Sequence, residues 1–204
     1  MSKFTNLTIG VLALQGDFER HQYQINLVGA TPREVRLAED LKDLDGLIIP
    51  GGESTTMNYL IDRFEIRQAL LESAKSIPYW GTCAGMILMA REIADNQAGV
   101  ETLNLMDMTV QRMGYGRQIY SVDETVPATL NGSPVILTAT FIRAPRITRT
   151  GDGLEVLANY DDVPVLVQSQ DHMACSFHTE LDNDTKLLDY FLTHFVLKKR
   201  SQNV

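Results

Sequence analysis

Residues 80–87, WGTCAGMI, place a cysteine between two glycines, directly after an apolar run and directly before a helical pattern. The spacing Gly81-x-Cys83-x-Gly85 is the sulfur analogue of G-x-S-x-G, in which a tight strand-to-helix turn lifts a nucleophile above a sheet. Side chains at the two glycine positions would collide with neighbouring backbone. The helix N-terminus would favour the thiolate and leave the Ala84 amide free to bind an oxyanion. Since most free cysteines are simply buried hydrophobes, the turn alone does not establish a nucleophile.

A nucleophilic cysteine needs a base, and the base needs an acid that orients it. The segment CSFHTEL, near the end of the last predicted strand, supplies His178 and Glu180 two positions apart. Residues i and i+2 of a strand point to the same face, so Glu180 can hold one nitrogen of His178 while the other faces Cys83. The sequence therefore predicts a Cys-His-Glu triad in that chain order.

The remaining histidines are weaker candidates for the base, and the second cysteine is a weaker candidate for the nucleophile. His21 and His194 lie in helical segments and are predicted to be surface or packing residues. His172 lies in the polar segment SQDHM. Cys175 lies in an apolar strand, which predicts a buried, inert thiol.

A second loop, IIPGGEST, follows a buried strand and precedes a helix. The consecutive glycines Gly51 and Gly52 allow a bent backbone whose N–H groups can point into a site. An ordinary turn with Ser54 or Thr55 as the helix N-cap is the alternative interpretation. Beside the cysteine turn, the loop favours the second half of an oxyanion hole.

The elements that must position these residues alternate in the first half of the chain. Apolar β-forming runs predict strands at 7–14, 45–52 and 77–82, and helical spacing predicts helices at 18–28, 55–73 and 84–94. Strands that are apolar on both faces and alternate with helices indicate a parallel sheet covered on two sides. Ligands gather at the carboxyl ends of such strands, where both loops lie.

The second half is β-rich and partly antiparallel, with short strand-like runs separated by Asn-Gly, Gly-Asp-Gly and Asp-Asp turns. The strands are predicted at 106–112, 133–142, 154–160, 163–169 and 173–178. An amphipathic helix is predicted at 184–200, with Asn183 or Asp184 as its cap. Its core-facing residues would be Leu187, Leu188, Phe191, Leu192 and Phe195. Without a repeat or linker, residues 1–204 are expected to form a single α/β domain.

The composition narrows the partners and the compartment. Over 204 residues the net charge is −8, which argues against nucleic acid as the main partner. No apolar run is long enough to span a membrane, and the N-terminus lacks a signal-peptide pattern. Two cysteines cannot form a disulfide framework, so a reducing cytoplasm is expected. We expect no metal and no cofactor on this chain, because it shows neither a metal-ligand cluster nor a dinucleotide-binding motif.

Six blocks carry a family resemblance: IGVLALQGDFERH, LIIPGGESTTM, GTCAGMILMA, GRQIYS, FIRAPRI and SFHTEL. In order and spacing they resemble the class I (triad) glutamine amidotransferases and, among these, the glutaminase-subunit family of pyridoxal 5′-phosphate synthases. The resemblance spans nearly the whole chain. It implies a three-layer, flavodoxin-like α/β fold, with a central mostly parallel sheet, helices on both faces and a β-rich, partly antiparallel second half.

The resemblance implies that Cys83 attacks the side-chain amide of L-glutamine, releasing ammonia and leaving a γ-glutamyl thioester. His178 would protonate the ammonia and then activate water, and Glu180 would orient His178. Amides of Gly51 or Gly52 and of Ala84 would bind the oxyanions. The implied glutamine pocket consists of Gly52, Glu53, Ser54, Arg112, Ile142 and Arg143. A guanidinium and a carboxylate suit a zwitterionic substrate, although Arg112, Arg117 and Arg143 would by themselves be interpreted as surface charges.

The resemblance also implies a partner, a (β/α)₈-barrel synthase subunit in a hetero-oligomer. That subunit would combine the ammonia with ribose 5-phosphate and glyceraldehyde 3-phosphate to make pyridoxal 5′-phosphate. The glutaminase is expected to be weak alone and stimulated on docking. Residues 12–17, LALQGD, are the candidate contact that organises the oxyanion hole.

Three departures from the family pattern stand out. Thr179 replaces the proline that usually follows the histidine, which would loosen the backbone between base and acid. Met113 follows Arg112 in place of an asparagine, and VQSQDHMAC lacks the usual Gly-Asn turn.

The sequence also leaves alternative functions open. They are a glutaminase of another synthase, a hydrolase of γ-glutamyl compounds, a catalytically silent structural subunit, or a cysteine-based stress protein of related fold.

Overall fold

A computed structural model describes residues 2–112, 114 and 122–202. Met113, Arg117 and the block GRQIYS lie outside the described residues. Within the described part, nine strands form one sheet in the order β2-β1-β3-β4-β12-β11-β10-β7-β8. The first five strands in that order run parallel to one another. They are β2 (Thr31–Val35), β1 (Thr8–Leu12), β3 (Gly46–Ile49), β4 (Tyr79–Thr82) and β12 (His172–Cys175).

The other half of the sheet is antiparallel and continues from β12. It contains β11 (Val163–Gln168), β10 (Glu155–Tyr160), β7 (Val122–Leu130) and β8 (Ser133–Phe141). The β7–β8 hairpin turns at Asn131 and Gly132, both with positive φ, as an Asn-Gly turn requires. A smaller sheet is formed by β5 (Ala90–Ile93), β6 (Met106–Gln111) and β9 (Arg146–Thr150).

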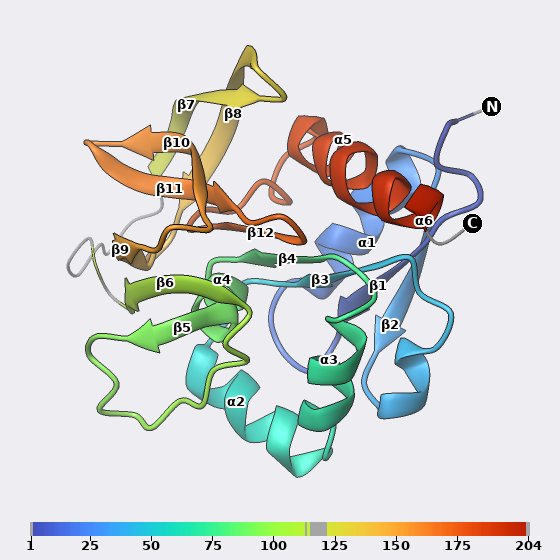
Figure 1. The fold of residues 1–204 in the computed structure, drawn as a ribbon, viewed down its shortest axis with the longest axis horizontal. Helices are drawn as coiled ribbons and strands as arrows, with labels where there is room; N and C mark the ends of the chain where they lie inside the picture. The colour runs from blue at the N-terminus through green and yellow to red at the C-terminus, as the bar shows by residue number, and fades with distance from the viewer. Residues whose placement is uncertain (1, 113, 115–121, 203–204) are drawn as a thin grey trace.

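Helices cover both faces of the parallel strands (Figure 1). One layer holds α1 (Phe18–Leu27) and the C-terminal helix, which runs through α5 (Lys186–Phe191), π-helical turns at Leu192–Leu197 and α6 (Lys198–Gln202). The opposite layer holds α2 (Ser54–Arg63), α3 (Arg67–Ser73) and α4 (Ala84–Met89). A short 3₁₀ turn, η1, spans Ala38–Leu41. This three-layer arrangement confirms the predicted fold class.

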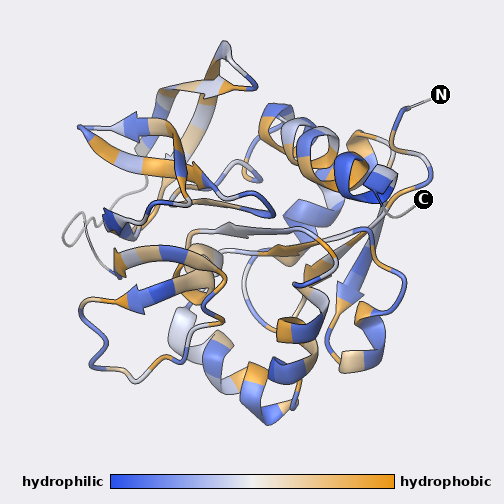
Figure 2. Ribbon diagram, in the orientation of Figure 1, coloured by the Kyte–Doolittle hydropathy of each residue, from blue (hydrophilic) through white to orange (hydrophobic). Residues whose placement is uncertain are grey.

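Alternation along each parallel strand divides the apolar core between the two layers. Ile48 and Trp80 pack in the cluster of α1 and α5, whereas Leu47, Ile49 and Tyr79 pack in the cluster of α2, α3 and α4. Polar and apolar residues alternate along α1 and α2, which are amphipathic, whereas α4 is buried throughout (Figure 2). Burial on both faces explains why the inner strands β1 and β3 are apolar, whereas the edge strand β2 is polar and mostly not buried.

The predicted helix at 55–73 is wrong as one element, because the chain breaks between α2 and α3. Glu65 takes a left-handed conformation (φ 53°), the Glu65 N–H donates to the Asp62 carbonyl, and the Ile66 N–H donates to the Ile61 carbonyl. These are the two hydrogen bonds of a Schellman motif, here without a glycine. The turn buries Ile66 completely, so tertiary packing ends a helix that the residue pattern continues.

The predicted helix at 84–94 is also too long. α4 ends at Met89, and the chain becomes extended at Ala90 (ψ 155°), which begins β5. The Leu88 and Met89 carbonyls accept hydrogen bonds from Leu103 and Leu105, and β5 pairs in parallel with β6. A partner strand more than ten residues ahead therefore decides the helix end.

The C-terminal helix begins at Lys186, two residues later than predicted, and the Asp184 carboxylate accepts the Lys186 N–H at 3.0 Å. The predicted core-facing residues are all buried, which confirms the amphipathic pattern: Leu187, Leu188, Phe191, Leu192 and Phe195. Among the described residues, none of these helices has the length and apolar character needed to cross a bilayer.

His172 is the first residue of β12, directly after the short turn that joins β12 to its antiparallel neighbour β11. It is 7% exposed, and its Nδ1 accepts the Tyr79 N–H at 3.2 Å across the β4–β12 pair. Burial lowers the pKa of His172 from 6.5 to about 4, more than Asp171 raises it. A neutral imidazole is therefore buried at the amino ends of β4 and β12.

We expect this histidine to make stability depend on pH. The unfolded chain takes up the proton near pH 6.5 and the folded chain only near pH 4, so between these values the unfolded state binds more protons. The free energy of unfolding should therefore rise with pH through this window, by about 3 kcal/mol from His172, and be fully gained above pH 6.5. Urea unfolding at several pH values from 4.5 to 7.5 measures it.

His172→Asn is the matched variant, because its amide oxygen can replace Nδ1 as the acceptor without titrating. Its stability should be lower at pH 7 but should vary less between pH 4.5 and 6.5. An equal pH dependence in the two proteins would rule out His172 as its source.

Candidate active site

Cys83 occupies the tight turn between β4 and α4. Its backbone has φ 49° and ψ −105°, a strained conformation for a residue with a side chain, and the residue is 6% exposed. A side chain at Gly85 would collide with the Ile49 carbonyl, and one at Gly81 with the Gly85 backbone. The glycines are thus required by close approach, as the motif predicts.

His178 and Glu180 lie beyond the last strand rather than on it. β12 ends at Cys175, so the prediction that the i, i+2 geometry of a strand aligns this pair is wrong. His178 instead forms an isolated antiparallel bridge with Thr140, with N–O distances of 2.9 and 3.0 Å. This bridge fixes the backbone, and His178 Nδ1 lies 2.6 Å from Glu180 Oε1. Thr179 in place of proline has not separated the pair.

The electrostatics favour a charged pair. Burial by itself lowers the pKa of His178, but hydrogen bonds to Cys83 and Glu180 and the charges of these groups raise it above its ordinary value. Burial would raise the pKa of Glu180, yet His21 and His178 keep it below its usual range. Burial also lowers the pKa of His21, so near pH 7 His21 is neutral. We therefore attribute the low pKa of Glu180 mainly to His178.

A cavity of about 380 Å³ opens above Cys83 and His178. Every residue of the predicted glutamine pocket lines it, as does Gly51 of the predicted oxyanion hole. Ala84 follows Cys83 as the first residue of α4, and Glu180 lies behind His178 with a fully buried side chain. The predicted residues are thus brought together in one place.

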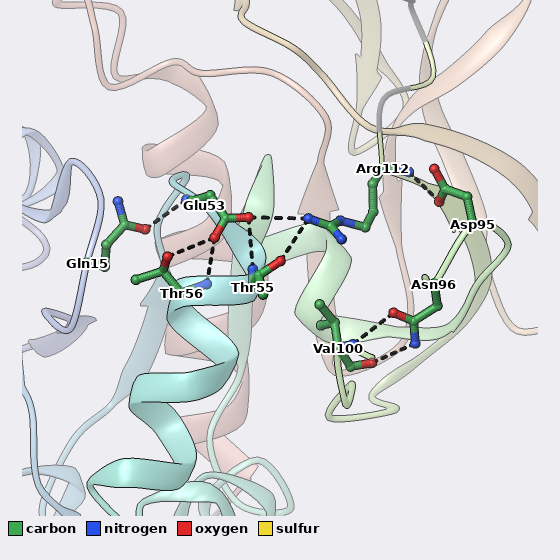
Figure 3. A network of polar contacts seen from close by, with 8 residues as sticks. All are labelled: Gln15, Glu53, Thr55, Thr56, Asp95, Asn96, Val100 and Arg112. Carbon is green, nitrogen blue, oxygen red and sulfur yellow. Dashed lines mark hydrogen bonds and ion pairs between the residues drawn. The ribbon is translucent and has the colours of Figure 1, made fainter. Parts of the chain in front are cut away.

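Glu53 is held by several groups at once (Figure 3). Its carboxylate caps α2 by accepting the N–H groups of Thr55 (3.1 Å) and Thr56 (2.6 Å), and it accepts the Thr56 hydroxyl at 2.8 Å. Arg112 Nη2 donates to the same carboxylate at 3.2 Å and to Thr55 Oγ1 at 2.9 Å. The N-cap of this helix is therefore Glu53, not Ser54 or Thr55.

Arg112 is held from the opposite side as well. Its backbone N–H donates to the Asp95 carboxylate at 3.0 Å, in the loop where Asn96 and Val100 exchange two hydrogen bonds (Figure 3). Arg143 differs, since it is exposed at the cavity rim and has a left-handed backbone, φ 46°. Of these two arginines, Arg112 is thus the anchored one.

The N-terminal segment contributes cavity residues that sequence reasoning placed only at a partner contact. Gln15, Gly16 and Asp17 line the cavity, and Gln15 Oε1 accepts the Glu53 N–H at 2.8 Å. A side chain at Gly16, whose φ is +95°, would collide with the Gly51 carbonyl. The segment therefore packs directly against the Gly51–Gly52 loop.

His21 is the residue whose environment the sequence least reveals. It is 1% exposed, and its Nε2 lies 3.3 Å from Thr82 Oγ1 and 3.6 Å from Glu180 Oε1. A helical position with mixed neighbours predicts surface or packing, and only the fold shows that this face of α1 meets Glu180. Cys175, by contrast, is buried as predicted, and burial raises the pKa of its thiol.

Comparison with known proteins gives a consistent family. The model of the SNO glutamine amidotransferase family matches residues 11–197. The pyridoxal 5′-phosphate synthase subunit PdxT of Kosmotoga olearia is 43% identical over 196 residues, covering 95% of this chain and all of that protein. PdxT of Dehalococcoides mccartyi is 44% identical over 188 residues, covering 91% of this chain and 96% of its own.

Solved structures agree with the sequence relatives. One described as a glutamine amidotransferase is 40% identical, covers 90% of this chain and 96% of its own, and superposes with a TM-score of 0.83. The structure of PurLQS from Thermotoga maritima has a TM-score of 0.64 at 14% identity, covering 98% of this chain and 99% of that one. The second likeness concerns the fold alone.

The cysteine turn supports a stability prediction. Gly85→Ala should lower the free energy of unfolding by about 1–3 kcal/mol, because the added methyl group meets the backbone carbonyl of Ile49 rather than a movable side chain. Gly153→Ala is the matched control, since no heavy atom lies within 4 Å of the added group. It should change stability by less than about 0.5 kcal/mol. Equal midpoints for both variants in urea unfolding would contradict the close approach.

Proposed function

Because this chain belongs to the SNO glutamine amidotransferase family, we propose that it hydrolyses L-glutamine to L-glutamate and ammonia for a pyridoxal 5′-phosphate synthase. One observation carries the proposal. Cys83, in a strained turn, and His178, held at 2.6 Å by Glu180, line the same cavity. A thiol, an imidazole and a carboxylate in this sequence of contacts are the parts of an activated nucleophile.

In the first half of the reaction, the Cys83 sulfur forms a bond to the side-chain amide carbon of glutamine. The carbonyl electron pair moves to oxygen, giving a tetrahedral oxyanion. When the carbon–nitrogen bond breaks, His178 gives its proton to the departing nitrogen, so ammonia leaves and a γ-glutamyl thioester remains. The raised pKa of His178 suits it to carry that proton at neutral pH.

In the second half, neutral His178 takes a proton from water, whose oxygen attacks the thioester carbon. A second oxyanion forms, the carbon–sulfur bond breaks, and glutamate leaves as the Cys83 thiolate is restored. Glu180 stabilises the imidazolium in both halves and keeps one ring nitrogen turned toward Cys83. The proton that His178 takes from water restores the imidazolium for the next cycle.

The oxyanions would be bound by the backbone N–H of Ala84 and by an N–H of Gly51 or Gly52. Removing one such donor typically costs about a hundred- to a thousandfold in rate. The Gly51–Gly52 loop packs against Gly16 and is tied to Gln15 through Glu53. Its conformation, and with it the oxyanion hole, is therefore open to control by residues 12–17.

One charged residue of the pocket suits an end of the substrate, and a second orders the loop around it. Arg143 at the rim can pair with the α-carboxylate of glutamine. Glu53 already accepts four hydrogen bonds and the charge of Arg112, so its main contribution is to order the loop around the substrate. Gly52, Ser54 and Ile142, which also line the cavity, complete the predicted glutamine pocket.

The ammonia is useful only to an acceptor enzyme, and the PdxT relatives are named as synthase subunits. We therefore propose a hetero-oligomer with a (β/α)₈-barrel synthase subunit that uses ribose 5-phosphate and glyceraldehyde 3-phosphate. Cys83 and Cys175 are both free thiols, which supports a reducing, cytoplasmic location.

The first test is ammonia release from L-glutamine by the wild type and Cys83→Ala, each with and without the barrel subunit. We expect activity that rises with the partner and is abolished in the variant, because the variant lacks the sulfur on which the thioester forms. Activity without stimulation would keep the nucleophile but point to another acceptor. No activity from a complex that still forms would overturn the enzyme assignment and leave a silent structural subunit.

The second test concerns the control of the oxyanion loop. Gln15→Ala removes the acceptor of the Glu53 N–H, a bond worth about 1 kcal/mol, so stimulation by the barrel subunit should fall roughly five- to tenfold. Gln22→Ala, a half-buried α1 residue outside the cavity, is the matched control and should be stimulated like the wild type. If saturating barrel subunit stimulates Gln15→Ala as much as the wild type, residues 12–17 do not transmit its effect to the oxyanion loop.

A further inference from the structure

The helix α1 presents an unusual buried face to the site. His21 is 1% exposed and Gln24 is fully buried, and three residues apart they share one side of the helix. Burying polar side chains is costly unless they find partners. Their polar partners are Thr82, beside the nucleophile, and residues 179–184, which follow the base.

The His21 ring lies against the far side of the triad. Its Nε2 is 3.6 Å from Glu180 Oε1, the same oxygen that His178 Nδ1 contacts at 2.6 Å. Nε2 is also 3.3 Å from Thr82 Oγ1, and the ring meets Trp80 edge-on with centroids 5.8 Å apart. Two imidazoles therefore approach one carboxylate oxygen from different elements.

The proton of neutral His21 belongs on Nε2. A bare nitrogen lone pair facing a carboxylate oxygen at this distance would be repelled, whereas an N–H is attracted. Thr82 Oγ1 then serves as the acceptor of the nearer contact. His21 thus directs an N–H dipole at Thr82 and Glu180 without adding a second full charge.

Gln24 ties the same helix to the backbone around Glu180. Its Nε2 donates to the carbonyl of Thr179 at 2.7 Å and lies 3.2 and 3.3 Å from the carbonyls of Asp182 and Asp184. These contacts span both sides of the acid in the chain. They fix α1, and with it His21, relative to the carboxylate.

The carboxylate has little other support. Glu180 has a fully buried side chain, and its Oε2 has no hydrogen-bond partner among the described residues. Its orientation therefore depends on Oε1, where His178 and His21 converge. A packing role would need only bulk at position 21, whereas this arrangement needs an N–H there.

We infer that His21 is a positioning residue of the active site, which holds the Glu180 carboxylate so that Glu180 can hold His178 toward Cys83. The inference rests on the proposed function for its consequence in catalysis. The titratable groups that face His21 are Glu180, His178 and Asp17. Without the His21 N–H, the Glu180 carboxylate is less well held, and its contact with the His178 imidazolium beside Cys83 weakens.

The test measures the reactivity of the Cys83 thiol rather than the turnover of glutamine. The rate of alkylation by iodoacetamide is followed from pH 5 to 9 in the full-length wild type and in His21→Leu. We expect His21→Leu to be about tenfold slower near pH 6.5, with its profile moved about one pH unit upward. His21→Asn, whose shorter amide does not reach the Nε2 position, should show the same loss and replaces His21→Leu if the latter does not fold. Cys83→Ser gives the background from buried Cys175.

Two controls separate positioning from packing. His21→Gln can place an amide N–H near the Nε2 position and should stay within about threefold of the wild type. Ile25→Val trims the same buried face of α1 away from Glu180, so its profile should match the wild type even if its melting temperature falls. A wild-type profile in folded His21→Leu, or a His21→Gln as slow as His21→Leu, would overturn the inference.

The glutamine assay keeps the two proposals distinguishable. With the barrel subunit present, His21→Leu should lose kcat about tenfold with KM nearly unchanged, because the substrate pocket is untouched. If the wild type releases no ammonia, the proposed function fails, while the alkylation profiles still decide whether His21 positions Glu180. A KM that rises while kcat stays constant would overturn the positioning role.

Discussion

The parallel pairing of β4 with β12 is the constraint on which the site depends. In this register Thr82 lies opposite Cys175, and the Cys83 N–H donates to the Cys175 carbonyl at 2.8 Å. The nucleophile thus leaves its strand beside the residue from which the chain continues to His178. Parallel strands end at the same edge of a sheet. The segments that carry Cys83 and His178, almost a hundred positions apart in the sequence, therefore leave the sheet side by side.

Beyond that edge the chain is no longer strand, and other contacts must finish the geometry. The bridge between Thr140 and His178 supplies the backbone restraint from the antiparallel half of the sheet. Glu180 is buried with a charge, which is costly unless its partners are well placed. The His178 contact offsets that cost directly, and α1 encloses the pair from behind. The parallel and antiparallel halves of the fold therefore both contribute contacts that place Glu180 and its partner His178.

The sequence predicted what depends on local spacing. The Gly81-x-Cys83-x-Gly85 turn, the alternation of strands and helices and the apolar face of the C-terminal helix all follow from neighbours in the chain. What it could not predict depends on partners far away. α4 ends where β5 pairs with β6, and Glu65 is left-handed so that Ile66 can be buried. His21 meets Glu180 only because the packing of α1 brings it to Trp80 and Thr82 of β4. In each case tertiary context overrides local preference.

Thr179 shows how such context can replace a local restraint. The family's proline would fix φ between base and acid, but the contact that holds this residue uses its carbonyl, which threonine and proline share. The residue is 3% exposed, and Gln24 from α1 and the Thr140 bridge hold the backbone on either side. Because contacts from α1 and Thr140 already hold this backbone, the proline ring of the family is not needed at position 179. The substitution is therefore compatible with a His178–Glu180 distance of 2.6 Å, because the restraint resides in the packing of α1.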